Sequence, residues 1–332
     1  MTKGRDTISH VSDFNLVINA ARKSKSVIIS GHQNPDGDAV GSCFALALAF
    51  ANLDIKPIVM LEPYSARYDF ITGSQYLSQN LYPDNFIPDT EVAISLDCAN
   101  KERLGPGLEP FEKASIKVVI DHHVSNSLYG TVNIIDEKAS STCELLLNLL
   151  DGSGVEITPD IASALFAGII TDTGGFRHNS TTPRTFLAAA RLLETGIDIS
   201  QIQRQAVYEH SPVEASVFAL AVGGMRIVPE LKLAVAGLTH DQMWERGATG
   251  TDLDGIAEYM LNTRGIEVSA LLSERKPGLI NISLRSTELN VNKIAGSFSG
   301  GGHVNAAGCR ISGDIPMAIE TIIQAVRTAY AT

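Results

Sequence analysis

Short apolar runs alternate with longer helical patterns over the first two hundred residues. Strand-like apolar runs occupy Ser26–Ser30, Lys56–Leu61, Val92–Leu96 and Lys117–Ile120. Helical patterns occupy Ala39–Ala51, Pro159–Ile170 and Pro183–Thr195, and a proline in the first turn suits the last two. Strands that alternate with helices are typical of a parallel sheet, so residues 1–200 are predicted to form an α/β domain.

The pattern changes after residue 200. Residues 201–224 look helical and carry no strand signal, so we predict a helical linker there. Residues 225–332 begin again with strand-like runs and end with helices: Leu233–Leu238, Glu267–Leu272 and Leu279–Leu284, then Asn290–Ser297 and Ile315–Ala331. This part is predicted to be a second, smaller α/β domain, and 332 residues suffice for two domains.

Composition narrows the class of protein. With 44% hydrophobic and 19% charged residues, the chain is globular rather than disordered. The longest uninterrupted apolar run, Cys43–Ala51, is well short of the roughly 20 residues that a membrane span needs. The first residues, MTKGRDTISH, lack the apolar core of a secretory signal, so we expect a cytoplasmic protein without membrane association. The scattered cysteines are then expected to be reduced.

The charge is acidic and uneven. The formal net charge is −11. Residues 1–224 hold 16 basic and 26 acidic residues, whereas residues 225–332 hold 10 and 11. This balance excludes a broad basic face for long duplex DNA. An anionic substrate would need local groups that offset the field of the first domain.

Aspartate and histidine are concentrated in four segments, each just after an apolar run. They are GHQNPDGDAVGS with His32, Asp36 and Asp38; ISLDCAN with Asp97; VVIDHHVSN with Asp121, His122 and His123; and IITDTGGF with Asp172. Three of them follow predicted strands and the fourth follows a helical run. In open parallel sheets, ligand sites form beyond the carboxyl ends of the strands, so these segments mark a candidate site.

Each segment taken alone also has a structural explanation. Asp38 could cap the helix that starts near Ala39, Pro35–Gly37 could be only a turn, and Asp172 could cap the turn that follows it. Three adjacent ionisable groups, Asp121 to His123, are harder to explain, because burying them unpaired is costly. All the structural explanations would have to hold together, so a common site is favoured.

The residue types point to divalent metal ions. Carboxylate oxygens and imidazole nitrogens without thiolates suit Mn²⁺ or Mg²⁺. Asp36 and Asp38 are two residues apart, so on an extended chain they could serve two neighbouring ions, and Asp97 could be shared. Two ions roughly 3.5–4 Å apart can clamp the oxygens of a phosphoryl displacement. Only the metal-loaded site would be near neutral and able to accept a phosphate.

A glycine-rich segment in the second domain is a candidate for anion binding. In SFSGGGHVNAAGCRIS, Gly300, Gly301 and Gly302 could bring backbone N–H groups against a phosphate, and His303 could donate to it. Arg285 could be a second anion clamp; Arg264 and Lys293 are weaker candidates. A flexible turn that leads into a helix is the structural alternative. The pattern is neither the nucleotide P-loop nor a dinucleotide fingerprint.

In this order, GHQNPDGDA, SLD, the DHH of VVIDHHVSN and TDTGGF resemble the four motifs of the DHH phosphoesterase superfamily. GSFSGGGHVNAAG is similar to the signature of its DHH-associated C-terminal domain. The two-domain length most resembles the NrnA type, the oligoribonucleases and 3′-phosphoadenosine-5′-phosphate (pAp) phosphatases. RecJ-type exonucleases are longer. Family II pyrophosphatases end differently, and Ser273–Lys276 only loosely echoes their basic motif.

The resemblance implies a role for each candidate residue. One ion would be held by His32, Asp36 and Asp97, and the other by Asp38, Asp97, His122 and Asp172. His123 would face the scissile phosphate, and Asp121 would orient an imidazole. The substrate would be held by Arg103, Arg285, Gly300, Gly301, Gly302 and His303.

The resemblance also implies an activity. We expect two divalent ions, Mn²⁺ above all, and hydrolysis of short single-stranded RNA or DNA oligonucleotides to nucleoside 5′-monophosphates and of pAp to AMP. A homodimer is also implied. Two alternatives stay open: a phosphodiesterase for linear or cyclic dinucleotides of the pApA type, and a nucleotide-binding sensor without turnover.

Overall fold

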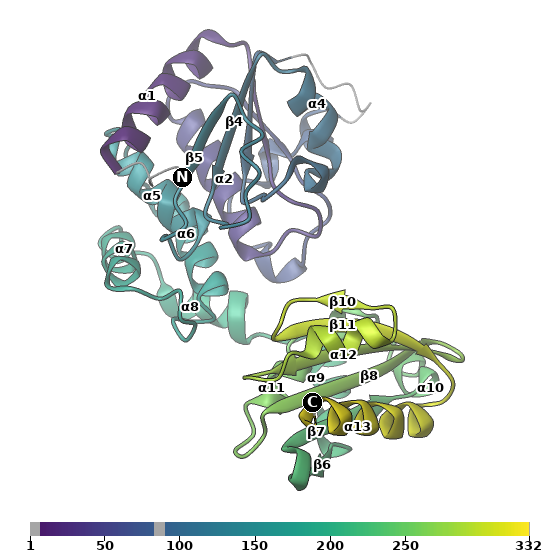
Figure 1. Ribbon diagram of the computed structural model, residues 1–332. Coiled ribbons are helices and arrows are strands. Elements are labelled where there is room, and N and C mark those ends of the chain that lie inside the picture. Colours follow the sequence, from purple (N-terminus) through teal and green to yellow (C-terminus); the bar gives the residue numbers. More distant parts are fainter. Residues whose placement is uncertain (1–6, 83–89, 332) are drawn as a thin grey trace. The chain divides into compact units, whose positions relative to one another are not determined.

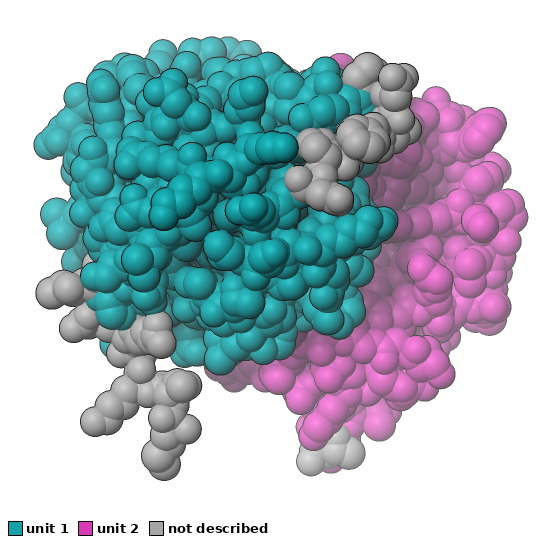
Figure 2. Space-filling model, turned by 90° about the horizontal axis from the view of Figure 1, so that it is seen from above, with its two compact units in different colours: residues 1–209 teal, residues 210–332 magenta. Residues whose placement is uncertain are grey.

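The chain folds into two units, each with its own sheet. The computed structural model describes residues 7–82 and 90–331, and the units are Met1–Glu209 and His210–Thr332, teal and magenta in Figure 2. The division falls inside the predicted linker: α8 (Ile199–Gln203) packs with α6 (Pro159–Asp172) of unit 1, whereas α9 (Pro212–Gly223) packs on unit 2. We describe each unit by itself.

Unit 1 contains a five-stranded sheet in which every neighbouring pair is parallel (Figure 1). Its strands are β1 (Val27–Ser30), β2 (Pro57–Met60), β3 (Val92–Leu96), β4 (Ile116–Asp121) and β5 (Val132–Ile135), in the order β2-β1-β3-β4-β5. The predicted α/β class and the first four strands are confirmed. β5 was missed because its run of four residues includes Asn133 and is only half-buried.

Alternation along the strands divides the core of unit 1 into two layers. Val27 and Ile29 of β1 pack on one face of the sheet, and Ile28 packs on the other. The larger layer is formed with α1, α2, α5 and α6, and the smaller layer includes Phe111 of α4. The α-helices that come before α8 in the described part of unit 1 are α1 (Thr7–Lys23), α2 (Gly37–Ala51), α3 (Ser78–Leu81), α4 (Leu108–Lys113), α5 (Thr142–Gly152), α6 (Pro159–Asp172) and α7 (Pro183–Leu193). Burial on both faces explains why these strands read as continuous apolar runs.

Helix α2 is the central helix of this unit. All of its residues from Gly37 to Phe50 are buried, as expected of a helix that is apolar on every side. It approaches α6 so closely that a Cβ on Gly41 would lie 2.4 Å from the carbonyl oxygen of Ala164. The glycine therefore sets the distance between these two helices.

Unit 2 contains a six-stranded mixed sheet in the order β10-β11-β9-β8-β7-β6 (Figure 1). Only β7 and β8 are parallel neighbours. The elements after α9 are β6 (Arg226–Val228), β7 (Leu233–Leu238), α10 (His240–Trp244), α11 (Ile256–Leu261), β8 (Val268–Lys276), β9 (Leu279–Ser286), α12 (Val291–Ser297), β10 (Gly301–Gly302), β11 (Ala306–Ser312) and α13 (Ile315–Ala331). Helices α12 and α13 and strands β7, β8 and β9 agree with the sequence prediction.

The glycine-rich segment forms a hairpin rather than a turn that leads into a helix. Gly301 and Gly302 pair with Gly308 and Ala307 of β11. A Cβ on Gly300 would lie 2.3 Å from the carbonyl oxygen of Gly308, and Gly302 has a φ of +151°. The glycines are thus needed for the close approach of two backbones.

Among the described residues, no helix is both long enough and apolar enough to cross a lipid bilayer.

The contact between α2 and α6 generates a stability prediction. Gly41→Ala is expected to lower the free energy of unfolding by about 1–3 kcal/mol, because the added methyl group overpacks the helix pair. Gly223→Ala, in α9 with open space around its Cβ, is the matched control and is expected to cause no loss. Thermal unfolding of both variants checks this, and equal stability of Gly41→Ala and the native protein would contradict the proposed packing limit.

Candidate metal centre

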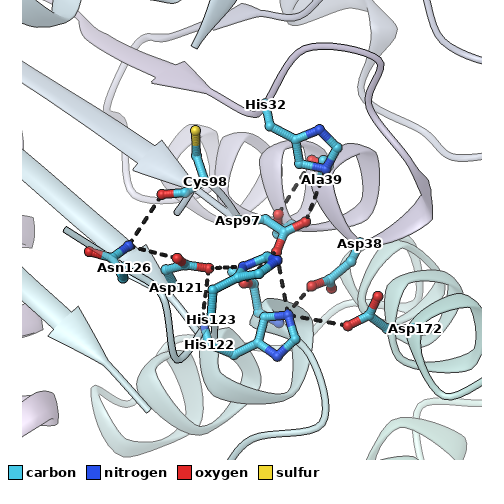
Figure 3. A network of polar contacts seen from close by, with 12 residues as sticks. His32, Asp38, Ala39, Asp97, Cys98, Asp121, His122, His123, Asn126 and Asp172 are labelled. Atoms are coloured by element: carbon cyan, nitrogen blue, oxygen red, sulfur yellow. Dashed lines mark hydrogen bonds and ion pairs between the residues drawn. The ribbon is translucent and has the colours of Figure 1, made fainter. Parts of the chain in front are cut away.

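Five elements of unit 1 deliver acidic and histidine side chains to one place. β1, β3 and β4 are neighbours in the sheet, and their carboxyl ends lead to His32, Asp97 and the pair His122–His123. Asp38 comes from the first turn of α2, and Asp172 is the last residue of α6. Figure 3 shows these side chains pointing toward one another. The topology of the parallel sheet explains why residues up to 140 positions apart in sequence meet here.

His32, Asp36 and Asp97 form the first group. The Nε2 atom of His32 lies 3.6 Å from Asp36 Oδ2 and 3.5 Å from Asp97 Oδ2. Its Nδ1 atom lies 2.8 Å from the carbonyl oxygen of Gln33, which can only accept a hydrogen bond. The proton is therefore placed on Nδ1, and Nε2 is left to face the carboxylates. One ligand atom from each residue lies within 4.8 Å of the others, which suits a metal ion.

Asp38, His122 and Asp172 form a second group with the same property. His122 Nε2 lies 3.2 Å from Asp172 Oδ2 and 3.6 Å from Asp97 Oδ1. Asp97 thus directs Oδ2 to His32 of the first group and Oδ1 to His122 of the second, and its sharing between two ions stays a prediction. The backbone at Asp97 has a φ of +54°, which aspartate tolerates better than most residues.

The sequence analysis assumed that Asp36 and Asp38 lie together on extended chain, and the structure shows that they do not. Asp36 is the N-cap of α2, and its Oδ1 accepts the backbone N–H groups of Asp38 and Ala39, both at 3.1 Å. Asp38 lies inside the helix and is fully buried. The capping role considered for Asp38 therefore belongs to Asp36, and the two carboxylates enter different groups because they occupy different positions on the helix.

Asp121 and His123 form a hydrogen-bonded pair beside Asp97. His123 Nδ1 lies 2.7 Å from Oδ1 of the fully buried Asp121, and Asn126 Nδ2 donates to Asp121 Oδ2 at 2.6 Å. The hydrogen bond to Asp121 raises the pKa of His123. Burial alone would raise the pKa of Asp121, but the hydrogen bond from His123 holds it below its usual value. The pair thus favours a protonated imidazole next to the carboxylate.

The close packing of carboxylates in both ligand groups fits the binding of divalent cations. Burial raises the pKa of Asp38 well above its usual range, and Asp97 and Asp172 raise it further. Burial and the neighbouring Asp97 raise the pKa of Asp172 to about 8. Burial opposes a charge on His32, but its hydrogen bonds with Asp36 and Asp97 raise its pKa to about 10. The raised pKa values mean that, without metal ions, bound protons reduce the negative charge of the cluster. Divalent ions would take the place of these protons.

Sequence analysis missed two residues of this site. Asn126 links the Asp121 carboxylate to the carbonyl oxygen of Cys98, 3.2 Å away. Thr142, at the start of α5, donates its hydroxyl to Asp97 Oδ1 at 3.1 Å. The position of Asn126 within VVIDHHVSN was a usable signal, whereas nothing near Thr142 in the sequence indicates its partner.

The candidate substrate residues lie in two places. Arg103 is exposed, and its terminal nitrogen lies 3.3 Å from His32 Nδ1, so it borders the carboxylate cluster. Arg285 of β9 is the register partner of Ala306, and two backbone hydrogen bonds join Ala306 to His303. Arg285, His303 and the exposed Gly301 and Gly302 therefore gather at one part of the sheet of unit 2. Their roles in binding stay predictions.

Comparisons with known proteins agree with this architecture. Residues 26–169 match the DHH family, N-terminal domain, and residues 230–331 match the DHHA1 domain. The bifunctional oligoribonuclease and PAP phosphatase NrnA of Thermus thermophilus is 31% identical over 311 residues, which is 91% of this chain and 89% of that protein.

Two solved structures are also similar. An exopolyphosphatase-related protein from Bacteroides fragilis has a TM-score of 0.85 at 25% identity, with 96% of both chains covered. RecJ of Thermus thermophilus in complex with Mn²⁺ has a TM-score of 0.57 at 14% identity, and the match covers all of this chain and 56% of that one. The RecJ comparison shows a shared fold.

The shared position of Asp97 generates a prediction on metal binding. Asp97→Ala is expected to abolish the binding of two Mn²⁺ ions, because both ligand groups lose a carboxylate oxygen. Asp121→Asn is expected to lower metal affinity or activity by only about 10–100-fold, because Asp121 acts by orienting the imidazole of His123. Elemental analysis after dialysis measures the bound ions, with Asp69→Ala as an exposed control in the same unit. Two ions retained by Asp97→Ala would overturn the shared assignment.

Proposed function

The chain belongs to the DHH family and is a metal-dependent phosphoesterase, and we propose that it hydrolyses short oligonucleotides to nucleoside 5′-monophosphates and pAp to AMP. The observation that carries the proposal is the carboxylate of Asp97, which faces two ligand groups at once. The similarity to NrnA over most of both chains supports the substrate class.

Residues of the two groups would hold two divalent ions. His32, Asp36 and Asp97 would hold one, and Asp38, Asp97, His122 and Asp172 the other. Bound there, divalent ions supply Lewis-acid stabilisation of phosphoryl oxygens and lower the pKa of water. The mixed set of nitrogen and oxygen donors favours Mn²⁺ over Mg²⁺, which prefers oxygen ligands and keeps its waters.

His123 would act on the substrate itself. Its Nδ1 is engaged by Asp121, so Nε2 is the nitrogen left to donate, and the side chain is 35% exposed. A protonated His123 can donate a hydrogen bond to a phosphoryl oxygen or to the departing oxygen. The Asp121 carboxylate keeps the imidazole oriented and charged for this task. A binding protein without turnover has no need of such a donor, so the arrangement favours an enzyme.

Substrate binding needs positive groups because the first domain is acidic. Arg103, beside His32, is the candidate in unit 1. In unit 2 the candidates are the guanidinium of Arg285, the imidazole of His303 and the exposed hairpin of Gly301 and Gly302, whereas the Gly300 N–H group already donates to the carbonyl oxygen of Ala295. Such a small set of donors suits a short or terminal nucleotide rather than a long duplex, whose binding relies on many phosphate contacts.

The proposed substrates are tested by product analysis with purified protein. We expect release of phosphate from pAp and of mononucleotides from a short oligoribonucleotide, with more turnover in Mn²⁺ than in Mg²⁺ and none after chelation. Hydrolysis of pApA with neither of the other products would replace the proposal by a dinucleotide phosphodiesterase. Nucleotide binding without any product would show a sensor.

A further prediction distinguishes the roles proposed for the two units. Changing Arg285→Ala and His303→Ala together is expected to lower kcat/KM for nucleotides much more than for a small artificial phosphodiester, which barely uses the candidate anion-binding residues. The number of bound ions is expected to stay unchanged, because the ligand groups lie in unit 1. Equal losses for both substrates, with the metal retained, would show that the glycine-rich segment does not select the substrate.

A further inference from the structure

A short segment at the start of α5 contacts three of the predicted metal ligands. The backbone N–H groups of Thr142 and Cys143 donate to Asp38 Oδ2 and Oδ1, at 2.6 and 2.9 Å. The Thr142 hydroxyl donates to Asp97 Oδ1 at 3.1 Å. The carbonyl oxygen of Ala139 lies 3.4 Å from His122 Nδ1. Residues 139–143 therefore border both ligand groups, although no motif of the sequence includes them.

The N-terminus of a helix is suited to holding a carboxylate. Its first backbone N–H groups have no partner inside the helix and carry partial positive charge. In α5, the N–H groups of Thr142 and Cys143 go to the Asp38 carboxylate, and that of Glu144 goes to the hydroxyl of the N-cap Ser141. Asp38 is therefore held by both of its oxygens, and its carboxylate cannot turn.

An ion pair with one buried partner holds this segment in place. Glu144 is fully buried; its Oε2 accepts hydrogen bonds from the hydroxyl and the N–H group of Ser140. Arg184, from the first turn of α7, lies 2.7 Å from Glu144 Oε1 and reaches Asp136 Oδ2 at the same distance. The Arg184 side chain is 36% exposed and only Glu144 is buried, so the arginine and the Ser140 donors together compensate the buried carboxylate and hold the start of α5.

We propose that Thr142 is a positioning residue of the metal centre, acting through its hydroxyl on Asp97. This proposal rests on the function proposed above. The hydroxyl occupies one lone pair of Oδ1, the oxygen that faces His122, while Oδ2 faces His32. The hydrogen bond fixes the rotation of the carboxylate, and with it the direction of both oxygens. A carboxylate that could rotate would serve one group at the expense of the other.

The experiment compares the metal-free protein and its Mn²⁺ complex for four variants. Thr142→Val removes the hydroxyl at nearly constant volume, Thr142→Ala removes it with less bulk, and Thr142→Ser keeps it. Thr195→Val is the matched control, because that hydroxyl donates to Leu192 at the end of α7, away from the ligand groups. All variants keep the backbone N–H groups that hold Asp38. Mn²⁺ affinity is measured by calorimetric titration, and folding by thermal unfolding without metal.

We expect Thr142→Val and Thr142→Ala to bind Mn²⁺ about 10–100-fold more weakly, as changes next to a ligand usually do. Thr142→Ser and Thr195→Val should bind like the native protein. A purely structural role would lower the melting temperature of the metal-free protein and leave the affinity unchanged, which would overturn the proposal. If Thr142→Val does not fold, Thr142→Ala against Thr142→Ser decides the question by the same affinity criterion.

The outcomes also separate this proposal from the proposed function. If the native protein binds no Mn²⁺, the two-metal site itself is wrong. If the native protein binds Mn²⁺ and Thr142→Val binds it equally well, only the role of Thr142 is wrong. A loss shared by Thr195→Val would show a general effect of removing a hydroxyl, and would likewise overturn the assignment to Asp97.

Discussion

The candidate site of unit 1 depends on holding several carboxylates close together. Asp38 and Asp97 are almost fully buried, and burial together with repulsion from Asp97 raises the pKa of Asp38. Such a cluster is costly unless charge and hydrogen bonds compensate it. Backbone N–H groups at the start of α2 donate to Asp36, and those at the start of α5 donate to Asp38. The imidazole of His32 faces Asp97. What these partners leave uncompensated is the charge that divalent ions would neutralise.

Small residues where α2 meets α6 make this arrangement possible. A Cβ on Gly37 would lie 2.4 Å from the side chain of Thr171, and one on Gly168 would lie 2.7 Å from Asp38 Oδ1. Larger residues at these positions would push Asp172 away from Asp38. The same close packing that forms the core therefore sets the spacing of the ligands, and a core change far from the solvent is felt at the site.

The sequence was a good guide wherever the position of a residue follows from topology. His32, Asp97 and His122 come after strands that are neighbours in a parallel sheet, so their meeting could be predicted. The two-residue spacing of Asp36 and Asp38 led to a wrong expectation of extended chain, because α2 begins at Gly37 and Asp38 lies inside it. Thr142 could not be found, because both of its partners are distant in sequence. Its hydroxyl reaches Asp97, 45 residues away, and its backbone N–H group, which every residue but proline has, reaches Asp38, 104 residues away.

The proposed separation of tasks between the units agrees with the same packing. The ligand groups and the partners that hold them come from residues 32–184, so all the candidate ligands belong to unit 1. The hairpin of Gly301 and Gly302 lies at the edge of a different sheet and shares no core with it. Under the proposed function, changes in unit 2 would alter which phosphate ester is held without disturbing the carboxylates. A separate recognition unit would then let one fold serve several substrates.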